Sequence, residues 1–174
     1  MSERTYTVGA VPARNAIRLQ FVQGRALSSR AISWFSSGHF SHVDVVLPDG
    51  RLLGARSDAA DGVKGVAIRR VNYEVWRKRV VFSLPVTQAQ MRTAHDFAAA
   101  QVGKPYDHTA ILGFMLNRAW MDSDAWYCAE LVMAMLEKAD VLGPLYLAAN
   151  KITPVAAALA VSARKGTTWE ELAC

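Results

Sequence analysis

The sequence predicts a single α+β domain, with strands in the first half of the chain and mostly helices in the second. Apolar and polar residues alternate with the period of a strand between residues 16 and 84, and the period becomes helical after Pro85. Strands followed by helices are typical of α+β domains, whereas βαβ units alternate the two. No linker or internal repeat interrupts the 174 residues, which suffice for one core. We therefore expect one domain over 1–174.

The predicted strands form an antiparallel meander. In the first, apolar Ile17, Leu19 and Phe21 alternate with polar residues. A Pro-Asp-Gly turn at residues 48–50 connects the second and third strands as a hairpin. The strands are predicted at Ala16–Phe21, Ser41–Leu47, Arg51–Ala55, Gly65–Val71 and Arg79–Leu84. A short helix over Leu27–Phe35, capped by Ser28 or Ser29, is expected between the first two.

Helix boundaries in the second half follow from capping signals. Thr87 and Gln90 have the spacing of a capping box, and this helix is expected to run to Val102 and stop at Gly103. Thr153 followed by Pro154 predicts the start of a last helix, which runs to Ala163. Two further helices are predicted at Thr109–Ala119 and Ala125–Ala139, the second capped by Asp122, Ser123 or Asp124 and ended by Gly143-Pro144.

Composition excludes several classes of protein. Hydrophobic residues make up 52% of the sequence and charged residues 20%, which is too apolar for a disordered chain. The net charge is +5, but the basic residues are scattered and lack interleaved aromatic residues, so no nucleic-acid partner is expected. The most apolar stretch, Val155–Val161, is too short to span a membrane. With no apolar export signal and only two cysteines, the expected location is the cytoplasm.

Cys128 is a candidate nucleophile because it lies in the first turn of a predicted helix. Unpaired backbone N–H groups and the positive end of the helix dipole favour a thiolate at that position. A nearby imidazole would transfer the protons that acyl transfer needs. A buried cysteine is also a common small hydrophobic residue, so the residues alone leave a structural role open.

Four histidines are available as partners, and composition does not choose among His39, His42, His95 and His108. His42 begins a predicted strand and shares one face of it with Asp44. The spacings typical of zinc sites, such as HxxxH, HExxH and CxxC, do not occur in the sequence. Glycine-rich phosphate loops and the GxSxG elbow of serine hydrolases are also missing. We expect neither a metal nor another cofactor.

Four segments between about Gln20 and Leu159 combine into one pattern. They are the strand-turn-strand Phe40–Leu53 around His42, the turn Gly103–Asp107, the helix start Trp126–Val132 around Cys128, and Ile152–Pro154. In this order they resemble the permuted NlpC/P60 (YiiX/YaeF-like) cysteine hydrolases, which are relatives of papain. The histidine precedes the cysteine, the reverse of the order in papain, as a circular permutation produces.

The resemblance implies a papain-like fold in permuted order, with an antiparallel sheet packed against helices. It implies that Cys128 is the nucleophile and His42 the general base and then the acid. The backbone N–H of Cys128 would donate to the oxyanion, with a second donor unidentified. Side chains expected to line the cleft are Ser41, Tyr106 and Tyr127. Glu130 is expected to be structural.

The residue that orients His42 remains open at this point. Relatives often have a polar residue on the returning strand, where this chain has Gly54. Ser57 or Asp58 would replace it if the register shifts, and a backbone carbonyl or water would also serve. Asp44 shares a face with His42, but i,i+2 neighbours on a strand are about 6–7 Å apart at Cα. Direct contact between the two is therefore possible but not favoured.

The expected function is hydrolysis of an amide bond, peptide or peptidoglycan-type, through a Cys128 thioester. Two alternatives are an acyltransferase or thioesterase acting on lipid, and a non-catalytic binding module on the same fold. The lack of an export signal argues against a cell-wall substrate, unless the protein is released by lysis or carried in a phage particle. Oligomeric state is not predicted.

Overall fold

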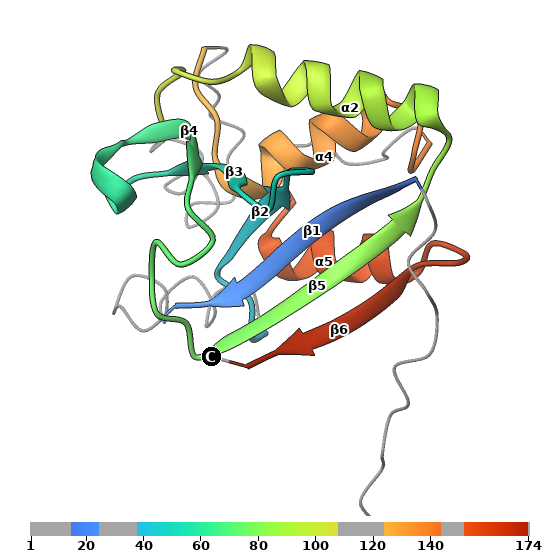
Figure 1. Cartoon of the computed structure of the whole chain (residues 1–174), viewed down its shortest axis with the longest axis horizontal. Helices are drawn as coiled ribbons and strands as arrows, with labels where there is room; N and C mark the ends of the chain where they lie inside the picture. The colour runs from blue at the N-terminus through green and yellow to red at the C-terminus, as the bar shows by residue number, and fades with distance from the viewer. Residues whose placement is uncertain (1–14, 25–37, 108–123, 144–151, 174) are drawn as a thin grey trace, which may run out of the picture.

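The structure is a computed structural model that describes residues 15–24, 38–107, 124–143 and 152–173. Its core is a six-stranded antiparallel sheet in the order β4-β3-β2-β1-β5-β6. Among the described residues, three α-helices accompany the sheet (Figure 1). Helix α4 packs against β2 and β3, α2 packs on α4, and α5 contacts β5. The predicted helices at Leu27–Phe35 and Thr109–Ala119 lie outside the described residues.

The first strand lies in the centre of the sheet. Strand β1 covers Ala16–Gln23 and pairs with β2 on one side and β5 on the other. The alternating residues Ile17, Leu19 and Phe21 are fully buried in the core, as their period predicts. The strand extends two residues beyond the predicted end.

The predicted hairpin forms between β2 and β3. Strand β2 covers His42–Val46 and β3 covers Leu52–Arg56. At the turn, Gly50 has a φ of +83°, a conformation that glycine adopts readily. All five residues of β2 are buried, including His42 and Asp44 at its start. A buried strand with two polar residues needs partners for them, and these partners form the site described below.

The meander prediction is correct for β1 to β4 and wrong for β5. Strand β4 covers Gly65–Arg69 and pairs with β3, as expected. Strand β5, Lys78–Pro85, does not pair with β4. It lies next to β1, on the side away from β2, and pairs with β1 over eight residues. Its period predicts a half-buried strand, but only tertiary packing decides which neighbour it joins. Backbone hydrogen bonds from the turn at residues 103–104 reach β4 instead.

The edge strand β6, Thr168–Leu172, is not predicted from the sequence. It contains two adjacent glutamates, and its burial alternates between intermediate and exposed. Such a short polar strand is typical of sheet edges and gives a weak signal. A 3₁₀ turn, η1, covers Ala60–Gly62 between β3 and β4.

Two of the three described helices begin where the capping signals place them. Helix α2 covers Gln88–Ala100 with a capping box between Thr87 and Gln90, and α5 covers Pro154–Ser162 with the Thr153 hydroxyl as its cap. Helix α4 covers Cys128–Lys138, three residues after its predicted start. It also ends before Gly143: a left-handed Asp140, with a φ of +52°, follows it. The described residues include no helix that combines the length and apolar character needed to cross a bilayer.

Candidate active site

Cys128 is the first residue of α4, and its side chain is buried at the N-terminal end of that helix. The predicted caps at residues 122–124 are wrong because Tyr127 is the N-cap. The preceding Trp126 pairs in a short parallel bridge with Tyr106, so its backbone is not helical. This bridge holds the Gly103–Asp107 turn against the segment that leads into Cys128.

Glu130 stabilises this end of α4, in agreement with its expected structural role. Its carboxylate accepts a hydrogen bond from the Tyr127 backbone N–H at 3.4 Å. Burial raises the pKa of Glu130 to about 7; the Tyr127 N–H opposes this rise and the nearby Asp107 adds to it. The folded protein therefore favours the protonated acid, although the unfolded chain ionises this group near pH 4.5.

The difference in free energy of unfolding between Glu130→Gln and the wild type is expected to shift in favour of the variant as the pH rises. Between pH 4.5 and about 7 the unfolded chain loses the Glu130 proton first, so the wild type loses stability over this window. At about 1.4 kcal/mol per pKa unit, the loss is about 3 kcal/mol at most. Thermal unfolding at pH 5 and pH 8 measures it, with the exposed Glu137→Gln of the same helix as the control. An equal difference in melting temperature at both pH values contradicts the prediction.

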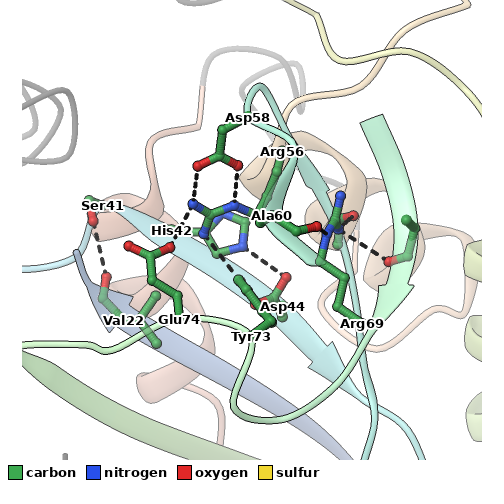
Figure 2. A network of polar contacts seen from close by, with 12 residues as sticks. Val22, Ser41, His42, Asp44, Arg56, Asp58, Ala60, Arg69, Tyr73 and Glu74 are labelled. Atoms are coloured by element: carbon green, nitrogen blue, oxygen red, sulfur yellow. Dashed lines mark hydrogen bonds and ion pairs between the residues drawn. The ribbon is translucent and has the colours of Figure 1, made fainter. Parts of the chain in front are cut away.

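His42 and Asp44 form a buried pair at the start of β2. The ring nitrogen Nε2 of His42 lies 2.8 Å from Oδ1 of Asp44 (Figure 2). The side chain of Cys128 also interacts electrostatically with this ring. Burial lowers the pKa of His42. The Asp44 carboxylate and the Cys128 side chain together raise this pKa by more than burial lowers it, so it rises to about 9. The structure thus brings together a helix-terminal thiol, an imidazole and a carboxylate.

The contact between His42 and Asp44, which spacing alone did not favour, depends on Gly54. Asp44 lies opposite Gly54 in the β2–β3 hairpin, and a Cβ at position 54 would be 1.9 Å from Asp44 Oδ1. The missing side chain therefore leaves the space that the carboxylate occupies. Gly54 is the position where the resemblance led us to expect a polar residue, and here a carboxylate from the neighbouring strand fills that region.

The other oxygen of Asp44 binds a residue that sequence reasoning missed. The Tyr73 hydroxyl donates to Asp44 Oδ2 at 2.7 Å, from the loop between β4 and β5. Trp76 of the same loop is buried, and its ring lies nearly parallel to that of His42, with centroids 6.4 Å apart. The available signal was a pair of aromatic residues in the short segment between two strands.

Arg56, at the end of β3, is the second residue that sequence reasoning missed. Its guanidinium binds Asp58 through Nε and Nη2, at 2.7 and 2.6 Å, and binds Glu74 at 2.7 Å (Figure 2). It also lies over the rings of Tyr73 and Trp76. Asp58 is therefore held by Arg56, and it is Asp44 that hydrogen-bonds the His42 ring. Ser57 is exposed.

The predicted cleft residues take different places. The Ser41 hydroxyl accepts from the Gly24 backbone N–H at 3.0 Å and donates to the Val22 carbonyl at 3.4 Å, so it connects β2 to the end of β1. Tyr127 is buried, and its hydroxyl donates to the Ile152 carbonyl. Tyr106 is half-buried, and burial and the nearby Cys128 both raise its pKa. Of these three side chains, Tyr106 is the one whose pKa is affected by both site residues: Cys128 raises it and Arg56 lowers it.

The remaining histidines do not share the position of His42. His39 is exposed, and His95 lies on α2, where burial lowers its pKa. His108 and the second cysteine, Cys174, lie outside the described residues.

The fold is similar to that of a solved protein, described as metalloprotein yiiX from Escherichia coli O157:H7. The TM-score is 0.58, the sequences are 19% identical, and the similarity covers 91% of this chain and 96% of that chain. No protein-family model and no curated protein matches the chain. At this level of identity the likeness concerns the fold alone: an α+β arrangement with a six-stranded antiparallel sheet.

The neighbour's description as a metalloprotein raises the question of a metal site in this chain. Within residues 15–24, 38–107, 124–143 and 152–173, no three His, Cys, Asp or Glu side chains are grouped as metal ligands. His42 engages Asp44 through Nε2, and its ring interacts electrostatically with the Cys128 side chain. This arrangement is compatible with proton transfer between the ring and the thiol.

Proposed function

We propose that this protein is a cysteine-dependent hydrolase that cleaves an amide bond, peptide or peptidoglycan-type, through a thioester on Cys128. One observation carries the proposal: a buried imidazole hydrogen-bonds to a carboxylate, and its pKa is raised by that carboxylate and by a thiol at a helix N-terminus. A nucleophile, a base within hydrogen-bonding reach and a third group that orients the base are the signature of nucleophilic catalysis. The fold shared with yiiX is compatible with this assignment.

The proposed reaction begins with proton transfer between Cys128 and His42. The ring takes the thiol proton, and the resulting imidazolium stabilises the negative charge on sulfur. The sulfur attacks the substrate carbonyl carbon, and the backbone N–H of Cys128 donates to the oxyanion. The imidazolium then protonates the leaving nitrogen as the C–N bond breaks, which releases the amine and leaves a thioester.

Water completes the proposed cycle. The neutral His42 ring accepts a proton from water as the water oxygen attacks the thioester carbonyl. The second tetrahedral intermediate collapses, the C–S bond breaks, and the carboxylic acid product leaves. The sulfur departs as a thiolate beside the imidazolium, which restores the starting pair. Asp44 keeps the ring oriented throughout and stabilises its cationic form.

Thiol labelling tests the pairing of Cys128 with His42 without any knowledge of the substrate. In a Cys174→Ser background, iodoacetamide is expected to label Cys128 rapidly at pH 6, where a free thiol, with a pKa of about 8.5, is almost fully protonated. His42→Gln removes the cation beside the sulfur and should lower the rate at pH 6 at least tenfold. Labelling that rises with pH like that of free cysteine, in both proteins, contradicts the proposal.

A substrate panel separates the proposed amidase from the lipid-directed alternative. Short peptides and peptidoglycan fragments are incubated beside acyl-chain esters and thioesters, and release of the amine or of the fatty acid is measured. We expect turnover of amide substrates. Faster turnover of the acyl-chain substrates would overturn the amide assignment while keeping the thioester chemistry.

A further inference from the structure

A chain of hydrogen bonds connects His42 to a charged cluster outside the proposed catalytic pair. It runs from His42 Nε2 to Asp44 Oδ1 at 2.8 Å, and from Asp44 Oδ2 to the Tyr73 hydroxyl at 2.7 Å. It continues from the Tyr73 oxygen to Arg56 Nη1 at 3.3 Å. Figure 2 shows these four side chains side by side, from the strands β2 and β3 and the loop that follows β4.

Arg56 determines the direction of this chain, because a guanidinium only donates hydrogen bonds. Its position is held by the carboxylates of Asp58 and Glu74 and by the aromatic rings of Tyr73 and Trp76. The Tyr73 oxygen therefore accepts from Arg56, and its own proton is left for Asp44. A hydroxyl has one proton and two lone pairs; with Arg56 donating to the oxygen, the accept-only carboxylate of Asp44 is the partner placed to take the proton.

The direction is passed on to the His42 ring. An ionised Asp44 accepts on both oxygens, from Tyr73 on one and from His42 on the other. Nε2 of His42 is therefore assigned as protonated, in the cation and in the neutral ring. Nδ1 is then the nitrogen that exchanges a proton with the Cys128 thiol, and it can accept one only when Nε2 keeps its own.

We infer that Arg56 and Tyr73 are positioning residues that orient the side chain at position 44 and so decide which of its two terminal atoms faces His42 Nε2. The catalytic consequence rests on the proposed function, but the tautomer itself does not. The hydrogen bonds run from Arg56, which only donates, through the Tyr73 hydroxyl to the side chain at position 44, which also accepts from the ring in the wild type.

Asp44→Asn tests the inference because an amide has one accepting and one donating end. If Tyr73 must donate, the oxygen of the new amide turns to Tyr73 and its NH₂ group faces His42 Nε2. The ring is then forced into the reversed tautomer, with the proton on Nδ1. In Asp44→Asn/Tyr73→Phe the amide is free to rotate, so its oxygen faces Nε2 and the original tautomer returns.

The measurement is a long-range ¹H–¹⁵N spectrum of protein labelled with ¹⁵N-histidine, recorded between pH 6 and pH 10.5. His42→Gln assigns the His42 signals, and the His39 and His95 signals report that each variant is folded. We expect the neutral ring to carry its proton on Nε2 in the wild type and in Tyr73→Phe, on Nδ1 in Asp44→Asn, and on Nε2 again in the double variant. An Asp44→Asn ring that keeps its Nε2 proton, or a double variant that keeps the reversed tautomer, overturns the inference.

Hydrolysis gives a second readout once a substrate is known. Asp44→Asn should lower kcat at least tenfold, and adding Tyr73→Phe should recover at least threefold of that loss. A merely structural Tyr73 predicts the opposite, because removing a second buried hydrogen bond would lower kcat again. Val75→Ala, an exposed position in the same loop, is the control and should change neither readout. Absence of all hydrolysis with the expected tautomers would contradict the proposed function and leave this inference standing.

Discussion

Cys128→Ala is expected to abolish amide hydrolysis, with a loss of at least about 1000-fold in kcat. Alanine removes the only atom of this side chain that can form the thioester, and neither His42 nor Asp44 can replace it. The substitution removes one sulfur from a buried position, so the fold should persist. Hydrolysis of an amide substrate is measured, and mass spectrometry of the quenched reaction detects the acyl-enzyme adduct.

The matched control is Cys174→Ser, which removes the other cysteine of the sequence. It should retain wild-type turnover and still form the adduct. Turnover that survives in Cys128→Ala, with Cys174 also replaced, would show that the chemistry does not pass through this thiol. Equal adduct formation by both variants would lead to the same conclusion.

Gly54→Ala is expected to lower kcat about 100-fold, although position 54 does not touch the reacting atoms. Its backbone is compatible with alanine, because it lies in a strand and its φ is not in the left-handed region. The new methyl group would lie 1.9 Å from Asp44 Oδ1, so the carboxylate must move away from His42. Small displacements of a catalytic group cost about this much in rate. Overpacking should also lower the free energy of unfolding by about 1–3 kcal/mol.

A double-mutant cycle with Asp44→Ala distinguishes this explanation from a general disturbance of the sheet. Once the carboxylate is gone, the methyl group has nothing to displace, so Asp44→Ala/Gly54→Ala should be as stable and as active as Asp44→Ala alone. Chemical unfolding and kcat are measured for all four proteins. Additive losses in the double variant would mean that Gly54 acts on something other than the Asp44 carboxylate.

Local signals in the sequence were sufficient for most of the elements. The alternation around Leu19 predicts β1, the Pro-Asp-Gly turn predicts the β2–β3 hairpin, and the hydroxyls of Thr87 and Thr153 predict the starts of α2 and α5. Each depends on interactions between residues a few positions apart. The start of α4 was predicted three residues early, because the bridge of Trp126 to Tyr106 is a contact that no local signal encodes.

The two ends of the candidate site could be inferred from the residues alone: a thiol at a helix start, and an imidazole at the start of a strand with Asp44 on the same face. Packing brings the thiol near enough to affect the ring's pKa, lets Asp44 reach the ring over Gly54, and places Tyr73 and Arg56 against the carboxylate. It also decided that β5 joins β1. The physical reason is the range of the interactions. Periodicity and capping act within a few residues, whereas these contacts join side chains from separate strands, a helix and a loop, whose distances are set only when the sheet and helices pack.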